Sequence, residues 1–157
     1  MAIVVGQPAP DFTLHETPQQ RRSLRDFRGR NVVLVFFPGA FTPVCTTEMC
    51  ALRDRLDRFS ALDAEIVGIT VDPPFVQAAW KSANDVGYTF LSDYKREVVT
   101  AYGVAFPDLA GMDGYVCANR AVTVVDKEGV VRHHWVGESL RVEPDYDELQ
   151  SVVAALP

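Results

Sequence analysis

The sequence is short of cysteine: three of its 157 residues are cysteines, and no two of them form a C-x-x-C pair. A disulfide framework uses cysteines in pairs, so an odd number favours a redox or catalytic role over structural bridges. Residues 1–14 also lack the basic leader and long apolar stretch of a secretory signal. We therefore expect a reducing, cytoplasmic setting, in which structural disulfides are rare.

Positive charge and long hydrophobic runs are scarce as well. Lys and Arg number 15 against 21 Asp and Glu, which gives a net charge of −6 at pH 7. Nucleic acids and anionic membrane surfaces repel such a chain, and no apolar run approaches the ~18 residues that a membrane span needs. We expect neither of them as a partner. The length favours one domain over residues 1–157.

Short apolar segments rich in β-branched or aromatic residues predict strands at 31–37, 64–72, 121–126 and 130–136. The first three are apolar throughout, as expected of strands covered on both faces. The last two are joined by Lys-Glu-Gly, which is typical of a hairpin turn. A weaker strand pattern covers 88–93.

Helical patterns lie between these strands. After Cys45, apolar residues recur at steps of three and four as far as Phe59, which predicts one amphipathic helix. Further helices are expected from Pro74 to about residue 84, over 96–103, and at the end of the chain with Pro144 in the first turn. This order predicts an α/β, thioredoxin-like fold, a central mixed sheet flanked by helices. Its reactive element is expected at the carboxyl end of the first central strand.

The stretch FFPGAFTPVCTTEMC, residues 36–50, follows that strand. Thr42 followed by Pro43 predicts a helix start, with Thr42 as N-cap and Pro43 as the first helical residue. Cys45 then takes the third helical position, near unpaired backbone N–H groups and the positive end of the helix, which favours a thiolate. The simpler alternative is a small buried cysteine that packs beneath a strand.

The helix end alone is too weak to keep Cys45 mostly as a thiolate at neutral pH. A thiol at its ordinary pKa of about 8.5 is only a few per cent thiolate at neutral pH, and a shift to about 6 takes roughly 3.4 kcal/mol. A helix terminus typically supplies about 0.3–1 kcal/mol, and up to ~2 when partly buried. A fixed cation is therefore expected nearby, and arginine suits because it stays charged and offers several donors.

Four ordered motifs carry a family resemblance: GQPAPDFTL, NVVLVFFPGAFTPVCTTE, LSDYKREVVTAYGV and ANRAVTVVDKEGVVR. The second resembles the P-x-x-x-T-x-x-C signature of the peroxiredoxins, which are thiol peroxidases without metal or bound cofactor. The resemblance places the signature on Pro38, Thr42 and Cys45 and the family's active-site arginine on Arg120. It places a glutamate that orients the arginine on Glu48, although Glu48 could simply suit the positive end of a helix.

The resemblance implies that Cys45 attacks a hydrogen peroxide or organic hydroperoxide and becomes a sulfenic acid. Donors from Thr42, Arg120 and the backbone N–H of Cys45 are expected to stabilise the leaving oxygen. Pro38, which lacks an N–H, is expected to shield the sulfur from water.

A second cysteine, Cys50, lies five residues after Cys45. In an ideal helix this spacing separates the Cα atoms by about 8.7 Å, beyond the ~4.4–6.8 Å that a disulfide requires. A bond between them therefore requires the first turn to unwind. The plus-five arrangement resembles the bacterioferritin-comigratory, or Q-type, branch, in which the second cysteine resolves the sulfenate before an external thiol, thioredoxin-like or other, recycles the disulfide.

Other segments resemble the alkyl-hydroperoxide-reductase-E-like branch, whose single cysteine is reduced by an external thiol. Three alternatives therefore stay open: a one-cysteine enzyme, a non-enzymatic redox sensor with Cys50 as spectator, and resolution by Cys117. A disulfide reductase or a metal-binding module is disfavoured, because C-x-x-C and H-x-x-x-H spacings are missing. The resemblance implies a monomer or a homodimer.

Overall fold

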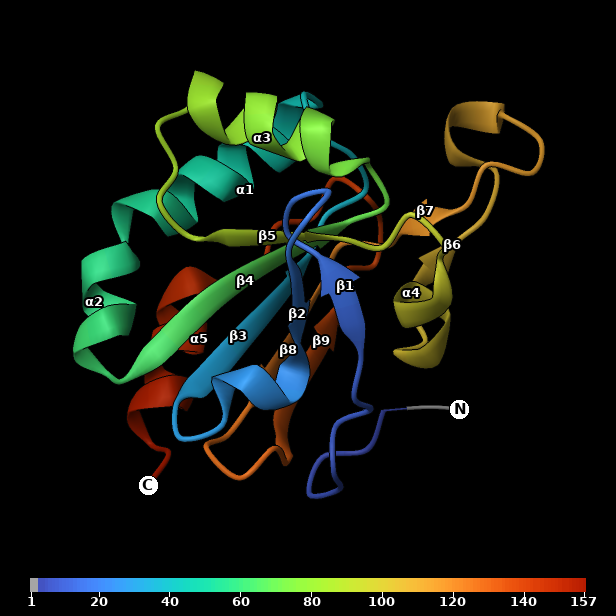
Figure 1. The fold of residues 1–157 in the computed structure, drawn as a ribbon. Helices are drawn as coiled ribbons and strands as arrows, with labels where there is room; N and C mark the ends of the chain where they lie inside the picture. The colour runs from blue at the N-terminus through green and yellow to red at the C-terminus, as the bar shows by residue number, and fades with distance from the viewer. Residues whose placement is uncertain (1–2) are drawn as a thin grey trace.

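The structure is a computed structural model that describes residues 3–157. Its centre is a seven-stranded sheet of order β2-β1-β5-β4-β3-β8-β9 (Figure 1). The strands are β1 (Thr13–His15), β2 (Arg21–Ser23), β3 (Asn31–Phe36), β4 (Ala64–Thr70), β5 (Thr89–Ser92), β8 (Ala121–Val125) and β9 (Val131–Val136). β6 (Ala105–Phe106) and β7 (Cys117–Ala118) pair separately.

The sheet is mixed. β3, β4 and β5 run parallel, whereas β8 pairs antiparallel with β3, and β9 with β8. All residues of β3 are buried, as its uninterrupted apolar run predicts for a central strand covered on both faces. The five strands predicted from the sequence are confirmed, with ends that differ by one or two residues. The short edge strand β2 and its neighbour β1 have no apolar run, so the sequence pattern does not predict them.

Helices cover both faces of the sheet. They are α1 (Pro43–Asp54), α2 (Leu56–Ala61), α3 (Pro74–Ala83), α4 (Glu97–Ala101) and α5 (Tyr146–Ala154), with 3-10 helices at Leu24–Phe27 and Leu109–Gly111. Because side chains alternate along a strand, Val33 and Val35 face the core shared with α1, α2, α3 and α5. Leu34 and Phe36 face the opposite core, shared with α4 and β7.

The helix predicted to run from the Cys45 region to Phe59 is two helices. The chain leaves α-helical geometry at Arg55, whose N–H bonds to the Leu52 carbonyl, and α2 begins at the next residue. The Arg55 side chain reaches across to α5, where it pairs with Asp147 at 2.7 Å and lies over the Tyr146 ring. The apolar periodicity continues across the break, so the pattern alone could not reveal it.

The prediction that Pro144 lies in the first turn of the last helix is wrong. α5 begins at Tyr146, and Asp145 is its N-cap, with a carboxylate that accepts the N–H of Glu148 at 3.0 Å. A capping carboxylate satisfies a helix-start donor that a proline cannot. Across residues 3–157 no helix has both the length and the apolar character needed to cross a membrane.

Candidate active site

The candidate site lies where β3 ends and α1 begins. The chain passes through buried Pro38 and Gly39, adopts a left-handed conformation at Phe41 (φ 62°), and enters α1 at Pro43. Thr42 is extended (φ −89°, ψ 149°) and occupies the N-cap position, so the predicted helix start is confirmed. Cys45 is the third helical residue, as expected, and it is 0% exposed.

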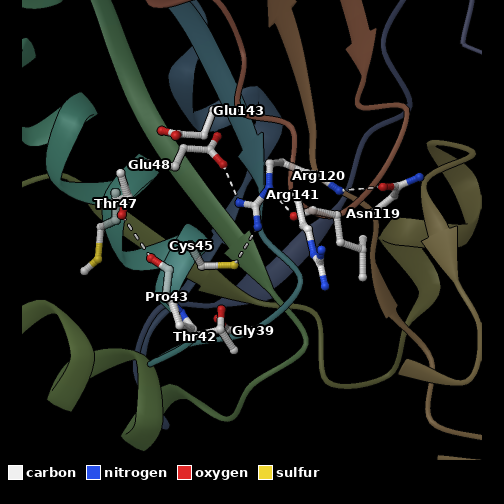
Figure 2. A network of polar contacts seen from close by, with 12 residues as sticks. Gly39, Thr42, Pro43, Cys45, Thr47, Glu48, Asn119, Arg120, Arg141 and Glu143 are labelled. Carbon is white, nitrogen blue, oxygen red and sulfur yellow. Dashed lines mark hydrogen bonds and ion pairs between the residues drawn. The ribbon is translucent and has the colours of Figure 1, made fainter. Parts of the chain in front are cut away.

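The Thr42 hydroxyl makes no hydrogen bond to the helix. Its oxygen donates to the Gly39 carbonyl at 2.8 Å instead, within the loop that precedes the helix (Figure 2). The first N–H groups of an α-helix have no partner inside the helix, and this side chain takes none of them. A threonine hydroxyl that has given its hydrogen to a carbonyl keeps lone pairs that can accept.

Arg120 reaches the Cys45 sulfur from the far end of the sequence. Antiparallel pairing of β8 with β3 sets Ala121 opposite Phe36, which brings residue 120 to the end of β3. The guanidinium, 2% exposed, donates from Nη2 to Cys45 Sγ at 3.3 Å (Figure 2). The sulfur therefore has a fixed cation beside it, as the energy comparison from the sequence requires.

Two further bonds fix the plane of this guanidinium. Arg120 Nη1 donates to Glu48 Oε1 at 2.7 Å, and Nε donates to the Leu140 carbonyl at 2.9 Å. The three acceptors come from α1 and from the loop between β9 and α5. A lysine could not occupy this place equivalently, because its ammonium lacks the planar fork of donors.

Glu48 shares that single cation with Cys45. It is 0% exposed, and burial raises the pKa of its carboxyl to about 7, against the hydrogen bond and the charge of Arg120 and with a further contribution from Glu143. Figure 2 shows Glu143 beside Glu48. Glu48 Oε2 has no hydrogen-bond partner. Burial opposes the charge of Arg120, but Cys45 and Glu48 outweigh it and raise the arginine pKa.

Cys50 does not approach Cys45 in this structure. α1 continues unbroken through both residues, and both thiols are free, so the ideal-helix separation of about 8.7 Å applies. Cys50 is half-buried, and its Sγ donates to Asn84 Oδ1 at 3.7 Å. The thiol therefore points toward α3, where Asn84 caps the helix.

Cys117 lies in the core on the other face of the sheet from Cys45. It is 0% exposed, and its β7 strand is paired with β6. Burial, assisted by the charges of Cys45 and Asp72 and opposed by Arg96, raises the pKa of this thiol to about 11. The chain thus holds Cys117 as a neutral thiol at physiological pH.

Some contributors could not be found from the sequence. The Asp72 carboxylate, just after β4, accepts the Ala40 N–H at 2.9 Å and anchors the loop that leads to Thr42. Leu140 contributes only its carbonyl, so its side chain carries no signal. Glu143 lies before the last helix, where an acidic residue is unremarkable in a sequence. Because Cys45 is fully buried, a peroxide reaches its sulfur only when the side chains around it move.

Peroxiredoxins are among the solved structures that share this fold. The crystal structure of peroxidoxin BcpB from Mycobacterium tuberculosis superposes with a TM-score of 0.85 at 29% identity, over 99% of both chains. Reduced 2-Cys peroxiredoxin from Plasmodium vivax gives the same TM-score and identity over 96% of this chain and 80% of the other. The sheet and its helices are thus thioredoxin-like, as predicted from the sequence.

The sequence profile of the AhpC/TSA family matches residues 5–134, and the chain belongs to this family. Alkyl hydroperoxide reductase E from Mycobacterium tuberculosis is 43% identical over 131 residues, which cover 82% of each chain. The resemblance to peroxiredoxins is thereby confirmed, and the protein is an enzyme, a thiol-dependent peroxidase.

Proposed function

We propose that this peroxiredoxin reduces hydrogen peroxide and organic hydroperoxides through a sulfenic acid at Cys45, which Cys50 resolves as an intramolecular disulfide. The observation that carries the first half is the 3.3 Å contact between Arg120 Nη2 and Cys45 Sγ at the start of α1. An arginine held there by Glu48 and by the Leu140 carbonyl stabilises both the thiolate and the charge that develops on the departing oxygen.

In the first step the Cys45 thiolate attacks the terminal oxygen of the hydroperoxide. An S–O bond forms and the O–O bond breaks. The electron pair leaves with the second oxygen, which takes up a proton to become an alcohol or water. Cys45 is oxidised by two electrons to the sulfenic acid. Arg120 and the first backbone N–H groups of α1 stabilise the leaving oxygen, because they are already oriented and need not reorganise.

The geometry revises the role of Thr42. Its hydroxyl hydrogen is directed at the Gly39 carbonyl, so it is not available as a donor for the leaving oxygen. Thr42 accepts a hydrogen bond from the hydroperoxide O–H instead and aligns the substrate. Glu48 positions Arg120. Pro38 is buried beside the loop and lacks an N–H, which keeps water from competing near the sulfur.

In the second step the Cys50 thiolate attacks the Cys45 sulfenic sulfur. An S–S bond forms, the S–O bond breaks, and the hydroxide that leaves is protonated to water. The beginning of α1 unwinds for this step, because the helix holds the two cysteines too far apart. An external dithiol, thioredoxin-like or of another kind, then supplies two electrons and becomes a disulfide. Cys117 suits resolution less well, because burial keeps it protonated and it lies in the opposite core.

A second candidate is a one-cysteine peroxiredoxin, or a redox sensor without turnover, in which Cys50 is a spectator. The bond from the Cys50 thiol to Asn84 favours it, because this cysteine is occupied while α1 is intact. We further propose a single domain over residues 1–157, a reducing cytoplasmic location without structural disulfides, and a monomer or homodimer.

Disulfide mapping after one equivalent of peroxide tests the proposal. Reduced protein is oxidised, blocked with a thiol reagent, digested and analysed by mass spectrometry. Linked peptides that contain Cys45 and Cys50 are expected. A dimedone-labelled Cys45 without a disulfide favours the one-cysteine alternative, and a Cys45–Cys117 link contradicts the role of Cys50. Steady-state peroxide consumption with an added dithiol separates turnover from sensing.

A further inference from the structure

One face of α1 is tied to its neighbours by side-chain hydrogen bonds. Thr46, Met49, Cys50 and Arg53 follow one another at steps of three, one and three, so they lie along a single stripe of the helix. Each takes part in a hydrogen bond with a residue in or near α3. The partners are Trp80 of α3, Asn84 directly after α3, and Tyr88 directly before β5. Figure 1 shows α3 lying alongside α1.

Two of these bonds come from buried aromatic residues. Trp80 of α3, 0% exposed, donates from its indole Nε1 to Thr46 Oγ1 at 3.1 Å. Tyr88, 4% exposed, donates its hydroxyl to the Met49 carbonyl at 2.8 Å. When the first turns of α1 leave α3, both buried donors lose their acceptors. An unsatisfied buried donor is unfavourable, so these contacts resist the opening of the helix.

Asn84 accepts the hydrogen bonds of the remaining two residues of the stripe, Cys50 and Arg53. Its side-chain oxygen accepts from Cys50 Sγ at 3.7 Å, and its backbone carbonyl accepts from Arg53 Nη1 at 2.6 Å. Its amide nitrogen donates to the Trp80 carbonyl at 3.0 Å, which fixes the orientation of the amide. Asn84 therefore ties Cys50 and Arg53 of α1 to the end of α3.

We infer that Trp80, Asn84 and Tyr88 form a clamp that holds α1 folded, and so sets the rate at which the Cys45 sulfenic acid is resolved. The inference rests on the proposed resolving role of Cys50. The three are positioning residues for the second step and leave the first step unchanged, because none of them contacts Arg120 or the Cys45 sulfur through a hydrogen bond.

The clamp has a chemical consequence. A sulfenic acid that waits for its resolving thiol can react with a second peroxide and become a sulfinic acid, which is not reversed by ordinary thiols. Resolution and this second oxidation compete for one intermediate. A tighter clamp therefore favours the sulfinic acid at high peroxide, and a looser clamp favours the disulfide.

The test compares Asn84→Ala and Trp80→Phe with the wild type. The first removes the acceptor of Cys50, and the second removes the donor to Thr46 while keeping an aromatic ring in the core. Ser82→Ala is the matched control, because Ser82 is an exposed α3 residue. Amide hydrogen exchange of α1 in the reduced proteins measures opening, with β4 amides as the reference for global stability. Rapid quenching after one equivalent of peroxide measures sulfenate formation and disulfide formation separately.

Each clamp variant is expected to raise α1 exchange and the rate of disulfide formation about threefold to tenfold, the effect of losing one ordinary hydrogen bond. Sulfenate formation stays within twofold, and the sulfinic acid fraction falls. Unchanged α1 exchange and disulfide rates in both variants overturn the clamp. Faster α1 exchange together with no Cys45–Cys50 disulfide in any protein, the wild type included, overturns the resolving role of Cys50 instead.

Discussion

Arg120 and Cys45 are separated by 75 positions in the sequence, yet the Arg120 Nη2 atom lies 3.3 Å from the Cys45 sulfur. The pairing of β8 with β3 produces this contact, because it sets the residue before β8 beside the end of the central strand. The same guanidinium also binds Glu48, so one buried cation serves two acids. The following predictions test the consequences.

Replacing Arg120 with lysine is expected to lower the second-order rate of Cys45 oxidation by roughly 10²–10³-fold, the typical loss for one preorganised donor. Lysine keeps the charge but cannot reach Cys45, Glu48 and the Leu140 carbonyl together. Stopped-flow oxidation under single-turnover conditions measures the rate. Arg141→Lys is the control, an exposed arginine that Figure 2 shows near the site. Equal rates in the Arg120 variant and the wild type contradict the proposed role.

Cysteine substitutions separate the two chemical steps. Cys45→Ser is expected to abolish peroxide consumption, because the attacking sulfur is gone. Cys50→Ser is expected to keep the rate of sulfenate formation within twofold, while the sulfenic acid accumulates. Cys117→Ser serves as the control, with normal oxidation and a normal disulfide. Dimedone labelling and mass spectrometry identify the species. A Cys50→Ser protein that turns over at the wild-type rate with a dithiol indicates a one-cysteine mechanism.

The raised pKa of Glu48 predicts that the stability of the fold depends on pH. Its folded pKa of about 7 lies above the ordinary 4.5, so between these values the folded chain keeps a proton that the unfolded chain has lost. Stability therefore falls as pH rises from about 4.5 to about 7. The test uses a Cys45→Ser background, which removes the coupled acid. The change in unfolding free energy caused by Glu48→Gln in this background is expected to be more stabilising at pH 8 than at pH 5, by up to about 3 kcal/mol. Urea unfolding at both pH values measures this, and a pH-independent difference contradicts it.

The lowered pKa of Asp126 predicts the opposite trend, a stability that rises with pH. Burial opposes the charge of its carboxylate, but bonds from the Val130 and Glu128 N–H groups and from Arg132 outweigh it and lower its pKa. Asp126→Asn is expected to lose about 1–3 kcal/mol of unfolding free energy at pH 7. The stabilising effect is complete above the unfolded pKa near 4 and disappears as pH falls through the lower folded value. Urea unfolding at pH 7 and pH 3 is the measurement. If the wild type and Asp126→Asn differ in unfolding free energy as much at pH 3 as at pH 7, the ionised carboxylate is not the source of the difference.

Much of the fold follows from the sequence because its signals are local. The β3 run is apolar at every position, and a strand covered on both faces requires that. Thr42 and Pro43 mark the helix start through backbone preferences that act within two residues. The break at Arg55 escaped prediction because the apolar periodicity continues across it.

The sequence by itself determined that Cys45 stands in the first turn of a helix after a buried strand, and that Cys50, five residues later, lies too far from Cys45 to bond while the helix lasts. Its motifs also pointed to the family and to Arg120. Tertiary structure alone decided that Arg120 meets the sulfur, that Thr42 donates to Gly39, and that Asn84 holds Cys50. Local backbone preferences are written in neighbouring residues, whereas the direction of a hydrogen bond depends on which distant strand or loop supplies its partner.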